Sequence, residues 1–222
     1  VLARKETFVF ISFLIFLNIS NSNYSSNLPQ YYVFLVLPII CLIWEPVVFF
    51  FPFIAAVLVI RLNNEKVIKL LSKIIICFIP ALVAFLITAT VIISPENHLI
   101  MEHSIESMGE ECYSSCGLFK YKASIASQFT YTFQIYQHEY FVRYFLIVLV
   151  GFAPFILLSL NTKLIRKVLF FQYFNNLFYP ILIILSPVVI MFAAMVDWGR
   201  VVNISYTFAV LFYFYLFKNN LL

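Results

Sequence analysis

Residues 74–94, IIICFIPALVAFLITATVIIS, decide the fold class of this chain. A helix needs about 20 mostly apolar residues to cross the hydrocarbon core of a bilayer. This run is apolar along its whole length and contains no charged side chain. It therefore predicts a membrane-spanning helix.

The rest of the chain has the same character. Hydrophobic residues make up 64% and charged residues 11% of the sequence, and the mean hydropathy is +0.99. A soluble domain carries about 25% charged residues. This composition excludes a soluble enzyme, a disordered segment and a nucleic-acid-binding protein, and it predicts an all-α, polytopic transmembrane helical bundle. The net charge of +4 is too small to indicate an acidic partner.

About six spans are predicted within a single membrane domain that covers residues 1–222. Besides 74–94, the apolar stretches are 7–19, 31–60, 141–160, 179–196 and 201–217. The stretch 31–60 would measure about 45 Å as one straight helix, which exceeds a hydrocarbon core of about 30 Å. It contains Pro38, Pro46 and Pro52, and each proline favours a kink. We interpret it as one long, bent crossing; the alternative is a re-entrant hairpin.

The stretch 7–19 is short for a span. Arg4 and Lys5 precede it, so it also resembles the start of a signal peptide. No convincing cleavage site follows, and we favour a first transmembrane helix. Because the chain opens at Val1 without an initiator Met, we expect the N-terminus to be truncated.

The charges between the spans predict sidedness. Three basic segments, 61–73, 161–178 and the residues after 217, lie on the same side as Arg4 and Lys5 if six spans are counted. The other side receives 20–30, 197–200 and the long loop 95–140, which is rich in glutamate. The positive-inside rule then predicts that both termini are cytoplasmic and that loop 95–140 is extracytoplasmic.

Two cysteines fall in that outer loop. Cys112 and Cys116 lie in a compartment that permits disulfides, and we predict a structural disulfide between them, with two free thiols as the alternative. His98, Glu102 and Glu106 would share one face of a helix in the same loop, but a solvated acidic face explains them better than a metal site. We predict neither a metal nor a cofactor.

Glu45 is the first candidate for chemistry. It lies in the middle of an apolar stretch, in Trp44-Glu45-Pro46. A charge at membrane depth costs about 2.5–3.5 kcal/mol on insertion scales. Pro46 leaves a backbone carbonyl without its usual donor, and membrane proteins build binding sites at such openings. We interpret Glu45 as a buried catalytic or binding acid; a solvated position near the interface is the alternative.

Asp197-Trp198-Gly199-Arg200 joins the last two spans. Asp197 is the only aspartate in the chain and fits a cap of the final helix, while Trp198 fits an interfacial anchor. In a functional interpretation, Asp197 is catalytic and Arg200 binds a phosphate or carboxylate. Arg143 is a second candidate for substrate binding, although Glu139 stands four residues earlier and would pair with it on a helix.

Two short segments resemble a loosely described set of bacterial inner-membrane proteins. Those proteins carry a His-Glu pair followed by aromatics and proline in one helix, and Asp-Trp-Gly-Arg-Trp before a late helix. The matching segments here are 42–52 and 196–201, where Trp44 replaces the histidine and Val201 replaces the second tryptophan. The resemblance implies the bacterial inner (plasma) membrane and an association with surface-polysaccharide assembly.

We therefore expect an integral membrane protein that acts on or binds a lipid-linked glycan, or another anionic lipid, at the outer face of the membrane. Its partners would be the bilayer and that lipid substrate. Two other functions fit the same residues: a transporter or channel component that uses Glu45 as its intramembrane ionisable site, and a non-catalytic assembly subunit.

Overall fold

The computed structural model describes residues 5–21, 27–63, 65–90, 94–109, 129–130, 132–134, 138–165, 171–195 and 197–222. Within these residues the protein is helical, with no named strand and one isolated bridge between Lys163 and Asn176. The named helices are α1 (Lys5–Ile19), α2 (Leu28–Ile43), the 3-10 helix η1 (Glu45–Phe50), α3 (Phe51–Arg61), α4 (Val67–Thr90), α5 (Pro95–Ser107), α8 (His138–Asn161), α9 (Phe178–Leu185), α10 (Val188–Ala194) and α11 (Trp198–Lys218). The predicted all-α class is confirmed.

Three helices are long and apolar enough to cross a membrane. They are Val67–Thr90, Val142–Asn161 and Trp198–Lys218, and they overlap the predicted spans 74–94, 141–160 and 201–217. The first of them begins at Val67, within the segment 61–73 that was predicted to be a basic loop. α2 is apolar but shorter. The chain is thus a helical protein with several segments suited to a bilayer, while the count of six spans stays a prediction.

The stretch 31–60 forms a hairpin and not one bent crossing. α2 ends at Ile43, Trp44 has extended backbone (φ −150°, ψ 94°), and η1 and α3 follow. Pro46 and Pro52 each lie in the first turn of a new helix, where a missing N–H costs nothing. The prolines therefore start helices here, and the interpretation as a single crossing is wrong.

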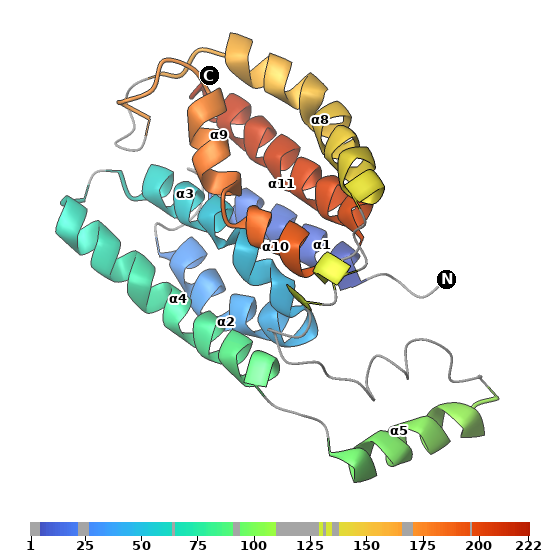
Figure 1. Ribbon diagram of the computed structural model, residues 1–222. Helices are drawn as coiled ribbons and strands as arrows, with labels where there is room; N and C mark the ends of the chain where they lie inside the picture. Colours follow the sequence, from blue (N-terminus) through green and yellow to red (C-terminus); the bar gives the residue numbers. More distant parts are fainter. Residues whose placement is uncertain are drawn as a thin grey trace.

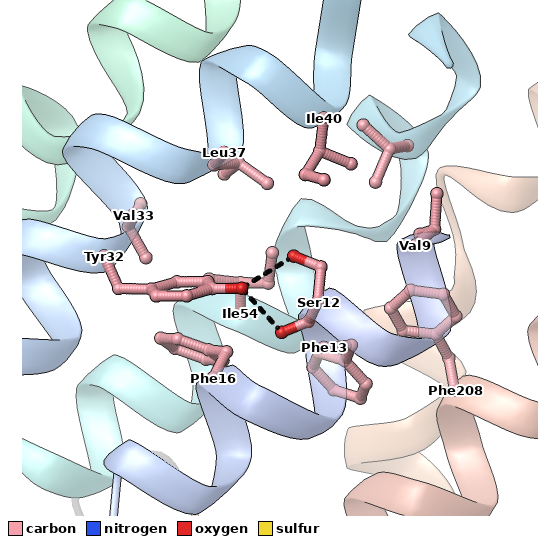
Figure 2. A pocket seen from close by; sticks show the side chains of 11 residues that line it. Val9, Ser12, Phe13, Phe16, Tyr32, Val33, Leu37, Ile40, Ile54 and Phe208 are labelled. Carbon is pink, nitrogen blue, oxygen red and sulfur yellow. Dashed lines mark hydrogen bonds between the residues drawn. The ribbon is translucent and has the colours of Figure 1, made fainter. Parts of the chain in front are cut away.

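The directions of the two helices of the hairpin, α2 and α3, follow from their contacts with α1 and α11. In α2, Tyr32 contacts Ser12 of α1: Tyr32 Oη lies 2.9 Å from Ser12 Oγ and donates to the Ser12 carbonyl at 3.0 Å (Figure 2). Further along α2, Ile40 lines the same small cavity as Val9. Residue numbers rise along α2 as they fall along α1, so the two helices are antiparallel. α3 runs back beside α11, since Phe50 contacts Phe208 and Phe53, further along, contacts Phe212.

The stretch 179–196 is also interrupted. α9 and α10 are separated by a turn at Ser186-Pro187, where the backbone N–H groups of Ser186 and Val189 bond to carbonyls three residues back. Pro187 has no N–H to continue the α-helical ladder. In Figure 1 the two halves of the interrupted helix α9–α10 are drawn between α8 and α11 on one side and α2 and α4 on the other, and both halves contact η1.

The first and last helices, α1 and α11, run parallel, and contacts join them at both ends. Glu6 at the start of α1 pairs with Arg200 at the start of α11. At the opposite end the Tyr215 hydroxyl donates to the Ser20 carbonyl at 3.3 Å, and Asn219 Nδ2 donates to Asn21 Oδ1 at 3.4 Å. Residues 5–6 therefore lie at the same end of the bundle as residues 197–200, which we call the Arg200 end. Residues 20–21 lie at the opposite end with residues 215–219, which we call the Lys218 end.

This arrangement corrects the predicted sidedness of the N-terminal part. The six-span scheme placed the start of the chain with the residues after 217 and opposite 197–200. The observed contacts place residues 5–6 with 197–200 instead. The cause is the α2–α3 hairpin. It adds one reversal of chain direction that the six-span scheme did not count. Every element before the hairpin therefore lies at the end of the bundle opposite to the one predicted.

Packed phenylalanines hold the centre of the bundle. Phe208 of α11 lies 4.5 Å from Phe13 and 4.4 Å from Phe50 between ring centroids, and Phe53 packs against it at 5.7 Å. All four side chains are buried. Such pairs add about 0.5–1.5 kcal/mol each beyond the area they bury, so α1, the hairpin and α11 form one core.

Candidate functional site

The start of α11 gathers three of the scarce charges. Asp197 Oδ1 accepts from the Arg200 backbone N–H at 3.0 Å, which confirms the predicted N-cap. The Arg200 Nε atom lies 3.4 Å from Asp197 Oδ2 and 3.4 Å from Glu6 Oε1. Arg200 thus bridges two carboxylates, one from its own helix and one from α1.

Glu6 is the member of this cluster that was not predicted from the sequence. Its side chain is only 12% exposed, against 42% for Arg200 and 58% for Asp197. It is the only carboxylate before Glu45, and an isolated acid at the start of an apolar helix is a signal that could have been used. Its partner could not be read from the sequence, because the contact joins opposite ends of the chain.

Trp198 ties this end to its neighbours. Its Nε1 donates to the Phe192 carbonyl at 2.7 Å, and its ring lies 5.6 Å from Tyr144 and 5.2 Å from Phe192 between centroids. Tyr144 lies near the start of α8, so α8 and α11 begin at the same end. The buried Trp198 is a packing residue between helices.

Arg143 lies at the Arg200 end but faces another direction. Its exposed side chain lines a shallow surface groove with apolar residues of α8, namely Val142, Leu146, Ile147 and Val150. Arg200 faces α1 through Glu6. The structure therefore brings Asp197 and Arg200 together and does not add Arg143 to them.

Glu45 lies on the outside of the fold. The helix opens at Trp44, close to the position that Pro46 predicts. The side chain turned into the core is Trp44, which stacks on Phe50 at 6.3 Å, whereas Glu45 is exposed. The interpretation of Glu45 as a buried acid does not fit this position.

Two further predictions concern the loop 95–140. Cys112 and Cys116 fall outside the described residues. Residues 95–107 do form a helix, α5, in which His103 Nδ1 lies 3.6 Å from Glu106 Oε2. Within the described part of the chain, no group of three or more potential metal-ligating side chains converges.

One cavity between the later helices was not predicted from the sequence. A cavity of about 330 Å³ lies between α8, α9, α10 and α11. Its lining is apolar apart from three serines: Val148, Leu149, Phe152, Phe155, Ile156, Ser159, Phe178, Ile181, Leu182, Leu185, Ser186, Val188, Val189, Phe192 and Ser205. The cavity of Figure 2, lined by α1, α2, η1, α3 and α11, is about 10 Å³ and holds at most one water.

Comparisons of the chain with protein-family models, with curated protein sequences and with solved structures find no match. A function for the chain is therefore inferred from its own residues.

Proposed function

We propose that this integral membrane protein binds a lipid with an anionic headgroup, and that the hydrocarbon chain of the lipid occupies the cavity between α8, α9, α10 and α11. The observation that carries the proposal is the apolar lining of that cavity. Its volume of about 330 Å³ lies within the range of small-molecule sites.

The three serines do not make the cavity polar. Ser159 donates to Ile156 O at 2.9 Å, Ser186 to Ile183 O at 2.8 Å, and Ser205 to Val201 O at 2.7 Å. Each serine hydroxyl therefore donates its proton to a backbone carbonyl of its own helical segment and not to a group in the cavity. A cavity with such walls stays dry and accepts apolar ligands, which favours a hydrocarbon chain over a sugar or an ion.

The position of the cavity favours a lipid from the bilayer. α8 and α11, which form two of its walls, are long and apolar enough to cross a membrane. Its floor includes the buried residues Phe155 and Ile181, while Leu182 and Val189 at its rim are 56% and 66% exposed. A chain can enter sideways from the hydrocarbon region without passing through water.

The headgroup would lie at the Arg200 end. Arg143 of α8 lies there with an exposed side chain, and arginine suits phosphate and carboxylate groups. The partial resemblance to proteins of surface-polysaccharide assembly favours a lipid-linked glycan as the natural ligand. We place this end on the extracytoplasmic side of a bacterial inner membrane, because most of the basic residues between helices lie at the opposite end.

A photoactivatable polyprenyl phosphate, incorporated into membranes with the full chain, tests the proposal. Val189→Trp places a bulky ring at the rim of the cavity and should lower crosslinking severalfold. Ile190→Trp is the matched control, since Ile190 is also exposed and does not line the cavity. Equal crosslinking in both variants would contradict the proposed site, and equal crosslinking by the uncharged polyprenol would contradict the anionic head.

One observation favours a transporter as a second candidate function. Two interrupted helices, α2–η1–α3 and α9–α10, contact each other, because η1 touches both halves of α9–α10. Transporters build midplane sites from such discontinuous helices. Solute flux through reconstituted protein, with no lipid crosslinking, would favour this function over lipid binding.

A further inference from the structure

A second, smaller groove lies between α1 and α11, at the Lys218 end of the bundle. Its volume is about 210 Å³, and it is lined by Leu14, Leu17, Asn18, Asn21, Leu211, Phe214, Tyr215 and Lys218. It shares no residue with the cavity between α8 and α11, so a ligand in this groove is independent of the proposed function.

The polarity of this groove changes along the helix axes. Leu14, Leu211 and Phe214 line the part nearer the middle of the bundle, whereas Asn18, Asn21 and Lys218 line the part nearer its end. Leu14 and Phe214 are 47% and 59% exposed, so the apolar part opens sideways. A groove that is apolar toward the membrane centre and polar toward its surface matches an amphiphile lying along the helices.

The polar part carries a positive charge and offers hydrogen-bond donors. Asn21 and Tyr215 already bond to Asn219 and Ser20 across the helix pair, and these contacts fix the shape of the groove. Lys218 contributes an exposed ammonium group. None of the described residues that line the groove is a carboxylate, which favours an anionic occupant.

The surroundings of the groove indicate which side of the membrane this end of the bundle faces. Arg61 ends α3, and the contacts Phe50–Phe208 and Phe53–Phe212 show that this segment runs in the same direction as α11, so the end of the α2–α3 hairpin shares this end of the bundle. The first turns of α4 and the residue before it add further cations. Of these, Lys73 pairs with Glu65, while Lys66 and Lys69 are exposed. Basic residues of this kind mark the cytoplasmic side, where membranes present anionic lipids.

We propose that the groove between α1 and α11 binds an anionic phospholipid of the leaflet at the Lys218 end. The acyl chain lies along Leu14, Leu211 and Phe214, and the phosphate contacts the ammonium of Lys218 and the carboxamide of Asn18.

The experiment measures which lipid the full chain retains. The protein is purified from mixed micelles with equal amounts of phosphatidylglycerol and phosphatidylcholine, and bound lipids are counted by native mass spectrometry. One lysine near a charged membrane surface is worth about a fivefold preference, so the wild type should retain phosphatidylglycerol about fivefold over phosphatidylcholine. Lys218→Gln should bring the ratio close to one.

Three variants keep the result interpretable. Lys218→Arg preserves the charge and should preserve the preference. Asn18→Asp introduces a carboxylate at an exposed position of the groove and should lower it. Lys69→Gln removes an exposed charge from the same end but outside the groove, and should leave the preference unchanged. The proposal is overturned if Lys218→Gln retains the wild-type ratio, or if Lys69→Gln lowers it equally.

Discussion

Arg200 joins α1 and α11 at one end of the bundle through a small cluster of charges. It is partly exposed and lies between Asp197 and Glu6, and an ion pair in such a position contributes about 0–1 kcal/mol. The backbone bond from Arg200 to Asp197 is a separate contribution, because it satisfies a donor that the helix itself leaves unpaired. The spacing in the sequence predicted this cap, which is local. It could not predict Glu6, because that contact depends on the tertiary fold.

Substitution of Asp197 separates the cap from the ion pair. Asp197→Ala should destabilise the protein by about 1 kcal/mol, which lowers the midpoint of thermal unfolding by about 2–4 °C in a chain of this size. Asp197→Asn keeps an oxygen that can cap and should lose much less. The measurement is thermal unfolding of the purified protein in detergent, and an equal loss in both variants would show that the charge, and not the cap, is what matters.

At the scale of elements, proline position decided which helices could be predicted from the sequence. The runs that became α4, α8 and α11 were predicted well, because in each of them apolar length alone defines a helix. Pro80 lies inside α4 and Pro154 inside α8 without ending either helix, yet Pro46 and Pro52 begin new helices. The difference is Trp44, whose burial against Phe50 stabilises the reversed direction, and that packing is not visible in the local sequence.

The contact between α8 and α11 depends on Gly151. A Cβ atom at this position would lie 2.8 Å from Val202 Cγ1, so the two helices approach closely only because the side chain is absent. Gly151→Leu should separate them and cost about 1–3 kcal/mol. Val202→Ala makes room, and the penalty for Gly151→Leu should be smaller in that background. A double-mutant cycle of unfolding free energies measures this coupling, and strictly additive losses would argue against the close approach.

For the whole molecule, the two ends differ in which segments they gather. The Arg200 end holds the starts of α1, α8 and α11, and the Lys218 end holds the segments 20–21, 61–73 and 215–222. The later helices were assigned consistently from the sequence, since α8 and α11 are indeed parallel. The direction of the first helix was predicted wrongly. The positive-inside rule assigns sides from the number of reversals between charged segments, and one reversal lay inside the apolar stretch 31–60, where no charged loop marks it.

Impermeant thiol labelling in intact cells tests this arrangement. In a chain whose native cysteines are replaced by serine, Thr7→Cys and Asn97→Cys should react from the same side of the membrane. Lys69→Cys should react only after the cells are opened. All three positions are exposed in the structure. Reaction of Thr7→Cys together with Lys69→Cys would restore the six-span order and contradict the parallel pairing of α1 with α11.

That pairing also has a consequence for biosynthesis. The bond between Ser20 and Tyr215 joins residues 195 positions apart, and Phe13 likewise reaches its aromatic partner Phe208 only after the long stretch between them has been made. At a synthesis rate of about 5–20 residues per second, the first helix waits for about 10–40 seconds before its final neighbour leaves the ribosome. During this interval lipid, or an insertion chaperone, must cover the aromatic face that α11 later occupies.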